Sequence, residues 1–458
     1  MSKVHEGKSF ALLRTVVDTT IAAILVVIVF QMMLFITDRI SHGRQYGANE
    51  KGFEHVDFIN FYMAGKIAAS SERKRIYDAE LEQQVYNEII APAKTYEHCF
   101  YHYPPYVFLI AEPFTLLNLD HAFEAFDFGT AAAGLAGLLL LMRGNKDLGM
   151  YDYVLILVAA LGIFPSLDNL RDGQFAWAFA ALFAFYFWAF VKKRDALAGL
   201  CLGMMAIKPH YLLFLMVGAL IGRRYKLIVV ALSVVLALCL SSAISFGPDS
   251  VLSYPALLRK MESSDSSVLL VPERMICLRG PLSLFISREA CLAIGIVTFL
   301  FGLLLVAYYW FLAQVRKSIP LEWAMALTIM VLLIASPHTL VYDATVIVVA
   351  AALTLKSARL TRMFESGPAS FKIWNFLLLM YPILSWVIMI FVPKIVAALL
   401  DPRFQSVFAV NGSSFGLTSF PCYLLLHIAL LVSGSIYVLS GAAKVDLQSP
   451  LSNKAQAN

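Results

Sequence analysis

The chain has 458 residues, of which 60% are hydrophobic and only 15% are charged, and its formal net charge is +5. A soluble domain has roughly 25% charged residues, so this composition, with a mean hydropathy of +0.73, excludes an ordinary soluble protein. The cations lie mostly in short loops between apolar segments, which is a topological signal and predicts no nucleic-acid partner. We therefore expect an all-α polytopic integral membrane protein.

The first apolar segment, 16–37, follows an N-terminus that carries Lys3, Lys8 and Arg14. It approaches the roughly 20 residues that a spanning helix needs and lacks a small-residue cleavage site. We interpret it as an uncleaved anchor that runs from inside to outside. In the outer loop 38–103 that follows, residues 58–68 show an amphipathic pattern typical of a helix lying along the membrane surface.

Residues 104–119 form a short apolar stretch interrupted by Pro104, Pro105, Glu112 and Pro113. Because proline removes a backbone donor and bends a helix, this stretch is poor material for a continuous lipid-facing span. A full span here would also move every later basic loop to the outer face. We predict a re-entrant or interfacial element on the outer face, and a model with one more span is the alternative.

The rest of the chain continues the pattern of apolar segments and short polar loops. Together with the first segment, the following segments predict about 12 spans with both termini inside: 123–142, 151–165, 174–191, 196–207, 210–222, 227–246, 291–314, 321–335, 340–356, 373–393 and 421–441. They form one transmembrane domain over 1–441. The outer loop 247–290 is a second interfacial region, and 442–458 is expected to be a disordered cytoplasmic tail.

Two kinds of loop alternate along the chain. One is short and basic, as in Lys192-Lys-Arg-Asp and Arg223-Arg-Tyr-Lys. The other carries acids, His, Gln and Pro, as in Asp168-Asn-Leu-Arg-Asp-Gly-Gln and Ser336-Pro-His-Thr-Leu-Val-Tyr-Asp. The positive-inside rule assigns the basic loops to the cytoplasm, which brings the second kind together on the outer face. We expect the active site on that face.

Several polar residues of this face have both a structural and a chemical interpretation. Asp57 stands before an apolar helix, where a carboxylate commonly caps the N-terminus, but a general base also requires such a carboxylate. Gln174 could contact another helix or a sugar hydroxyl. Lys208 and His210 lie at a hairpin tip on the side that disfavours cations, which favours a bound phosphate over a snorkelling lysine. For His338 and Asp343 the structural alternative is a mutual hydrogen bond.

Several motifs, taken in chain order, carry a resemblance. They are Asp57-Phe-Ile-Asn-Phe-Tyr-Met-Ala-Gly, Ile76-Tyr-Asp, Phe100-Tyr-His-Tyr-Pro-Pro, Asp172-Gly-Gln, Ala206-Ile-Lys-Pro-His, Arg223-Arg and Ser336-Pro-His-Thr with Tyr342-Asp343. Their order over 57–343 resembles glycosyltransferase family 87 of the GT-C superfamily, which includes mycobacterial mannosyltransferases with a polyprenyl-phosphate mannose donor. The resemblance implies a GT-C-type fold, an outer-face site and inverting transfer without a nucleotide donor.

The resemblance also assigns residues. Asp57 matches the acidic residue that serves as the base in GT-C enzymes, and Gln174 and Lys208 match positions with a donor-site role. The chain departs from the mycobacterial branch at Met275-Ile276, where amide residues are expected, and at Tyr342-Asp343, where that branch tends to show His. These departures argue against a mannosyl-inositol acceptor and leave the polyprenyl-phosphate donor in place.

The sequence therefore predicts a glycosyltransferase of the bacterial inner membrane with a periplasmic active site. It would move mannose, or another hexose or pentose, from a polyprenyl-phosphate donor to a lipid or glycan acceptor, without a metal or other cofactor. Asp57 would be the base. Lys208, His210, Gln174, Arg171 and Arg279 would bind the donor and its phosphate, and Tyr62, Tyr103, His338 and Asp343 would bind substrate. A transporter or flippase, or a polysaccharide polymerase or ligase, is the alternative.

Overall fold

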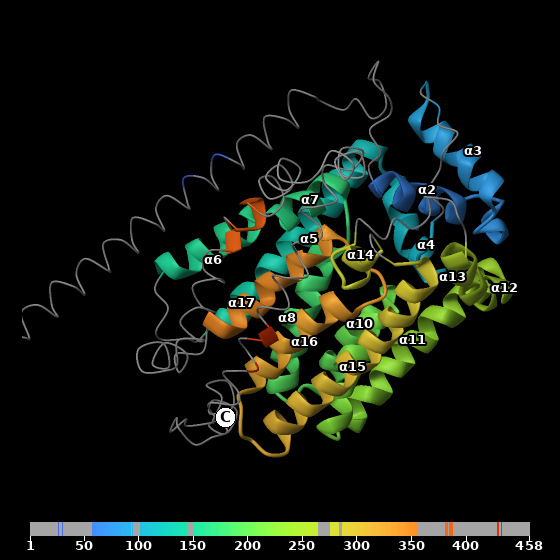
Figure 1. The fold of residues 1–458 in the computed structure, drawn as a ribbon. Coiled ribbons are helices and arrows are strands. Elements are labelled where there is room, and N and C mark those ends of the chain that lie inside the picture. Colours follow the sequence, from blue (N-terminus) through green and yellow to red (C-terminus); the bar gives the residue numbers. More distant parts are fainter. Residues whose placement is uncertain are drawn as a thin grey trace, which may run out of the picture.

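The computed structural model describes residues 57–92, 94, 101–143, 150–263, 275–283 and 286–355, and the isolated positions 26, 30, 381, 382, 384–387, 428, 429 and 432. Every regular element in these ranges is a helix. Figure 1 shows a bundle of long helices with several short helices gathered at one end. We call this end the outer end, because the predicted outer loops 38–103 and 247–290 supply its short helices.

The outer end is built from helices that flank the bundle (Figure 1). They are α2 (Asp57–Ala69), η1 (Arg73–Arg75), α3 (Ala79–Ile90), α4 (Tyr106–Ala111), η2 (Glu112–Leu116), α12 (Asp249–Leu252), α13 (Tyr254–Ser263) and α14 (Arg279–Leu282). Local chemistry sets their ends: Asp78, for example, accepts hydrogen bonds from the backbone N–H groups of Glu80 and Leu81 at 3.1 Å and so caps α3.

The bundle contains the remaining described helices. They are α5 (Leu119–Met142), α6 (Met150–Gly162), α7 (Phe164–Asp172), α8 (Ala176–Val191), α9 (Asp195–Met204) with η3 (Met205–Ile207), α10 (Pro209–Ile221), α11 (Tyr225–Phe246), α15 (Arg288–Gln314), α16 (Leu321–Ala335), η5 (Val341–Val346) and α17 (Ile347–Leu355). Each predicted span between 123 and 356 coincides with one of these helices or with a helix pair.

Burial divides the bundle into a core and a lipid-facing exterior. Every residue of α16 except Leu321 is buried. In contrast, α11 exposes Val229, Leu232, Leu236 and Leu240. A soluble protein rarely exposes so large an apolar surface, so these helices identify a membrane protein.

The predicted count of about 12 spans is not confirmed by the part of the chain that the structure describes. There, α5, α11 and α15 are long and apolar enough to cross a bilayer alone, and α7 with α8, bent by 119°, would make a fourth span. Other apolar helices, such as α10 and α16, have only 10–17 residues. The predicted segments 16–37, 373–393 and 421–441 and the tail 442–458 lie outside the described ranges, apart from the isolated positions.

Two expectations about the outer end can be compared with the structure. The predicted helix at 58–68 exists as α2, and all of its residues except Asp57, Lys66 and Ala69 are buried; its place along the membrane surface stays a prediction. Helix α2 is therefore covered by protein on almost all sides. The stretch 104–119 contains α4 and η2, of 6 and 5 residues, with the change of helix type at Glu112 and Pro113. Its relation to the membrane stays a prediction.

Candidate active site

A chain of three side chains begins at the first residue of α2. Asp57 accepts a hydrogen bond through Oδ2 from Nε2 of Gln174 at 2.6 Å. The Oε1 atom of the same amide accepts a hydrogen bond from the hydroxyl of Tyr103 at 3.1 Å. Gln174 is buried, with 7% of its surface exposed, so the amide is held between two partners in a site largely shielded from water. The three residues come from separate segments of the chain. The hydrogen bond between Gln174 and Asp57 joins residues 117 positions apart, and the one between Tyr103 and Gln174 joins residues 71 positions apart.

The turn between α7 and α8 brings Gln174 to Asp57. Gly173 ends α7 with a left-handed φ of 65°, a conformation that glycine adopts without steric cost. A Cβ atom at this position would also lie 2.5 Å from Cβ of Phe58 and from Cε2 of Phe123. Any larger residue would therefore push the turn away from the start of α2. The Asp-Gly-Gln motif places an amide beside a carboxylate because its glycine permits this close approach.

Lys208 and Asp343 form a buried ion pair near the first chain. Nζ of Lys208 contacts Oδ1 of Asp343, and the two side chains are only 9% and 1% exposed. Oδ2 of Asp343 accepts a hydrogen bond from the backbone N–H of Leu340 at 2.9 Å. Aromatic rings surround the ammonium group: the ring centroids of Phe179, Tyr211 and Tyr342 lie 5.9, 5.6 and 5.5 Å from Nζ. The charge of Lys208 is thus balanced by one carboxylate and three ring faces.

Basic side chains gather around His338, in the loop between α16 and η5. Its ring packs against that of His102 with a centroid distance of 5.8 Å. The pKa of His338 lies well below its ordinary value, chiefly because burial disfavours the charged ring. Four neighbouring basic groups lower the pKa of His338 further: His102, Lys208, His210 and Arg279. His338 is therefore neutral at physiological pH.

Arg279 is a second buried cation of this basic group. It is 2% exposed and begins α14. Its guanidinium donates two hydrogen bonds to the carboxylate of Glu262 on α13, at 2.8 and 2.6 Å. This bidentate pairing fixes the guanidinium plane. Lys208 and Arg279 are therefore each balanced by a carboxylate, which is Asp343 for the lysine and Glu262 for the arginine.

Tyr103 connects the acidic and the basic parts of the site. Burial raises the pKa of its hydroxyl well above the ordinary value, and the negative charges of Asp343 and Asp57 raise it further. Both carboxylates must therefore lie within electrostatic range of one phenol. The hydroxyl stays protonated at physiological pH and can act as a donor. The site is a single region with a carboxylate chain on one side and paired cations on the other.

Several predicted site residues have partners that the sequence did not indicate. Asp343 pairs with Lys208, so the mutual hydrogen bond considered for His338 and Asp343 is not its role. The hydroxyl of Tyr62 donates to the carbonyl of Leu117 at 2.8 Å and so ties α2 to the end of η2. Arg171 lies on α7 with an exposed side chain. Ring packing places His210 against Tyr211, with centroids 4.8 Å apart.

The structure adds residues that sequence reasoning missed. Glu262, Phe179 and Tyr211 contact the two cations, but nothing in their local sequence marks them. His102 lies within Phe100-Tyr-His-Tyr-Pro-Pro, one of the motifs that carry the resemblance, and this was a usable signal.

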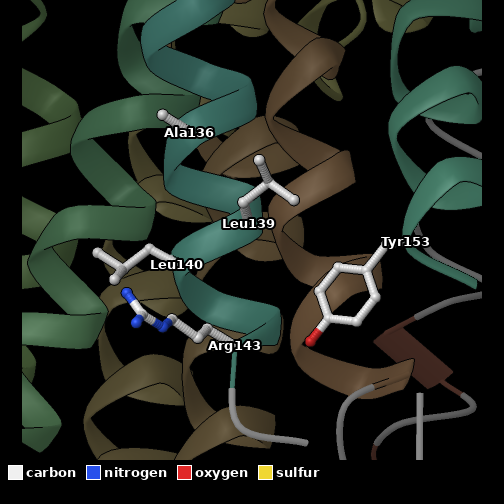
Figure 2. Close-up of a pocket in the computed structure, with 5 residues that line it drawn as sticks. All are labelled: Ala136, Leu139, Leu140, Arg143 and Tyr153. Carbon is white, nitrogen blue, oxygen red and sulfur yellow. The ribbon is translucent and has the colours of Figure 1, made fainter. Parts of the chain in front are cut away.

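A cavity of about 450 Å³ lies away from these residues. Figure 2 shows its lining, which is Ala136, Leu139, Leu140, Arg143 and Tyr153. Arg143 follows the last residue of α5, whereas Phe123, near the start of α5, packs against Phe58 with a centroid distance of 5.0 Å. At about 1.5 Å per residue, roughly 30 Å of helix separates these two ends. The cavity therefore belongs to the opposite end of the bundle, which we call the inner end.

The fold and the site define a polytopic, all-helical membrane protein with a polar site at one end of an apolar bundle. The family model described as Glycosyltransferase family 87 matches residues 101–337, more than half of the chain. The chain belongs to glycosyltransferase family 87, as its motifs predicted, and membership indicates a membrane glycosyltransferase. Comparisons with curated proteins and with solved structures gave no match.

Proposed function

We propose that this membrane glycosyltransferase transfers one sugar from a polyprenyl-phosphate donor to a lipid or glycan acceptor on the outer face of a bacterial inner membrane. The sugar is mannose or another hexose or pentose, and the transfer inverts the anomeric configuration. The observation that carries the proposal is the location of Asp57. Its carboxylate lies at the outer end, joined to Gln174 and within electrostatic range of the Tyr103 hydroxyl that Asp343 also influences.

Asp57 supplies the base in this proposal. An inverting transfer needs a group that removes the proton of the acceptor hydroxyl while the bond to phosphate breaks. The amide of Gln174 holds the Asp57 carboxylate through a hydrogen bond to Oδ2. In the proposed reaction this carboxylate takes the acceptor proton on the side of the sugar opposite the leaving phosphate.

The basic part of the site supplies the counter-charge for the leaving phosphate. Lys208 and Arg279 are both buried, and buried cations stabilise developing negative charge far more than exposed ones do. Because Asp343 and Glu262 already balance these cations, an entering phosphate must share them. His338 and His210 extend the same surface. The exposed apolar faces of α11 and α15 provide a lipid-facing exterior along which a polyprenyl tail can lie.

The test uses the purified full-length protein in nanodiscs with a total bacterial lipid extract as acceptor source. A panel of polyprenyl-phosphate sugars is supplied, each with a radiolabelled mannose, glucose, galactose or arabinose. GDP-mannose, UDP-glucose and a diphosphate-linked oligosaccharide are supplied in parallel. We expect label to move only from one of the monophosphate-linked donors. Transfer from a nucleotide sugar or from the diphosphate-linked oligosaccharide, or no transfer from any donor, would contradict the proposal.

A further inference from the structure

We infer that Gln174 and Tyr103 are positioning residues for the Asp57 carboxylate and are not contacts of the sugar donor. The inference rests on the proposed role of Asp57 as the base. It replaces the donor-binding and substrate-binding roles that the sequence predicts for these two residues. The observation behind it is the continuous chain of hydrogen bonds from the Tyr103 hydroxyl through the Gln174 amide to Oδ2 of Asp57.

The order of donors and acceptors along this chain has one consistent direction. The Nε2 group of Gln174 donates to Oδ2 of Asp57, so the amide turns its NH₂ group toward the carboxylate. The amide oxygen then faces Tyr103 and requires a donor there. The phenol is that donor, because its raised pKa keeps it protonated. Tyr103 therefore fixes which end of the Gln174 amide faces the carboxylate.

Each member of the chain is held by contacts that do not involve Asp57. The backbone carbonyl of Tyr103 accepts a hydrogen bond from the Tyr77 hydroxyl at 2.8 Å. The ring of Tyr103 packs on Phe175 with a centroid distance of 5.5 Å. Gly173 holds Gln174 close to α2 through its left-handed conformation. A rigid support of this kind is what a base requires, because a misplaced base loses rate without losing substrate affinity.

Donor binding and positioning predict different kinetics, and the experiment measures both constants. The full-length enzyme is assayed with decaprenyl-phosphate [¹⁴C]mannose and the lipid extract. We expect Gln174→Leu to lower kcat on the order of 10- to 100-fold and to change the donor KM by less than about twofold. Gln84→Leu is the matched control, since Gln84 is exposed on α3 and donates a hydrogen bond to Glu88, one turn further along the same helix. It should change neither constant.

A residue that acts through Asp57 has nothing to position once the carboxylate is gone. In an Asp57→Asn background, Gln174→Leu should therefore lower kcat by less than about twofold. Tyr103→Phe should lower kcat less than Gln174→Leu does and should have little effect in the Gln174→Leu background. Tyr153→Phe is its control, because that hydroxyl donates to the carbonyl of Met142 at the inner end. Multiplicative losses in these pairs, or a raised donor KM with unchanged kcat, would overturn the inference.

A measurement without substrate keeps the two proposals apart. Thermal unfolding of wild type, Asp57→Ala, Gln174→Leu and the double variant forms a second cycle, because alanine at position 57 has no oxygen that could accept from the Gln174 amide. We expect the two changes in Tm to be non-additive, because each variant removes the same hydrogen bond. Additive changes would contradict the inference even if the enzyme is active. If wild type transfers no sugar, the proposed function fails, and this unfolding cycle alone decides whether Gln174 holds Asp57.

Discussion

The two ends of the bundle each contain an ion pair between distant segments, and the pairs differ in construction. At the inner end, the guanidinium of Arg224 bonds to Asp195 and donates to the carbonyl of Phe190 at 3.1 Å. These partners are the start of α9 and the end of α8, so the arginine joins three helix ends. At the outer end, Lys208 meets Asp343 with side chains only 9% and 1% exposed, against 17% and 22% for the inner pair.

The choice of cation explains the difference. Arginine presents several fixed donors in a plane and suits a permanent clamp, whereas lysine is a compact point charge on a flexible stem. The inner pair satisfies its donors with a carboxylate and a backbone carbonyl, and it faces the predicted cytoplasmic side. The outer pair lies among rings and histidines in the candidate active site. The comparison teaches that the inner pair serves the fold, whereas the outer pair stands where the proposed function requires a phosphate to be bound.

The largest expected effect is all-or-none and tests which end faces which compartment. In a cysteine-free background, Arg194→Cys at the inner end should be unreactive to an impermeant thiol reagent added to intact cells. Lys74→Cys, an exposed position on η1 at the outer end, should react fully. The reason is the positive-inside rule, which assigns the basic inner loops to the cytoplasm. Labelling of position 194 from outside would invert the topology and with it the comparison.

The next largest effect concerns the base at the outer end. Asp57→Asn keeps the shape of the side chain and its ability to cap a helix, so the Tm should change little. Loss of the base should lower the transfer rate on the order of 10² to 10⁴-fold at saturating acceptor. Asp249→Asn is the matched control, since Asp249 is an exposed residue in the first turn of α12, and its rate should stay at the wild-type level. A wild-type rate in Asp57→Asn would leave the carboxylate with a capping role only.

The ion pairs themselves provide a sharper comparison. Lys208→Met should weaken donor use by about 2 to 5 kcal/mol, because it removes one partner of a desolvated charge pair. It should also lower the Tm, since Asp343 is left buried and unpaired. Adding Asp343→Asn removes the stranded charge and should restore the Tm but not the donor use. Arg224→Met should lower the Tm alone. If the double variant used the donor as well as wild type does, the pair of Lys208 and Asp343 would only stabilise the fold, as the inner pair of Arg224 and Asp195 does.

The positions of the bundle helices were readable from the sequence because polar loops separate its apolar segments, although their number of membrane crossings is not confirmed. The segment predicted at 321–335 is α16 with the same bounds, and the segment at 123–142 is α5 extended to Leu119. The buried state of α2 was not readable. Its pattern of apolar residues resembles that of a surface helix, and it is the packing of α3, α4, η2 and α5 against it that covers the remaining face.

The sequence indicated which residues gather at the candidate site, but it did not indicate which of them contact one another. Asp57, Gln174 and Lys208 stand in motifs that the sequence displays, and the structure brings all three to one end of the bundle. Which side chain meets which depends on contacts across 117 and 135 residues. A single sequence carries no signal at that range, so neither the Lys208–Asp343 pair nor the hydrogen bond from Gln174 to Asp57 could be predicted from it. Local motifs predict where polar groups gather, and tertiary packing decides how they are used.

The smallest expected effect is a pH dependence at the outer end. The pKa of His338 is lowered in the folded protein, chiefly by burial and then by His102, Lys208, His210 and Arg279. An unfolded histidine has a pKa of about 6.5, so the unfolded chain binds the proton that the folded chain refuses. The stability contributed by neutral His338 is therefore complete above about pH 6.5 and is lost as the pH falls below that value.

Replacement of His338 by Gln removes this loss. We expect the Tm of His338→Gln to fall less than that of wild type between about pH 7 and pH 5. His121→Gln is the control, because His121 is exposed on α5 beside Glu124, and its Tm should follow wild type across the range. Parallel curves for all three proteins would mean that His338 takes up its proton as readily in the folded protein as in the unfolded chain. The burial and the basic groups around His338 would then not lower its pKa, and the site would gain positive charge as the pH falls.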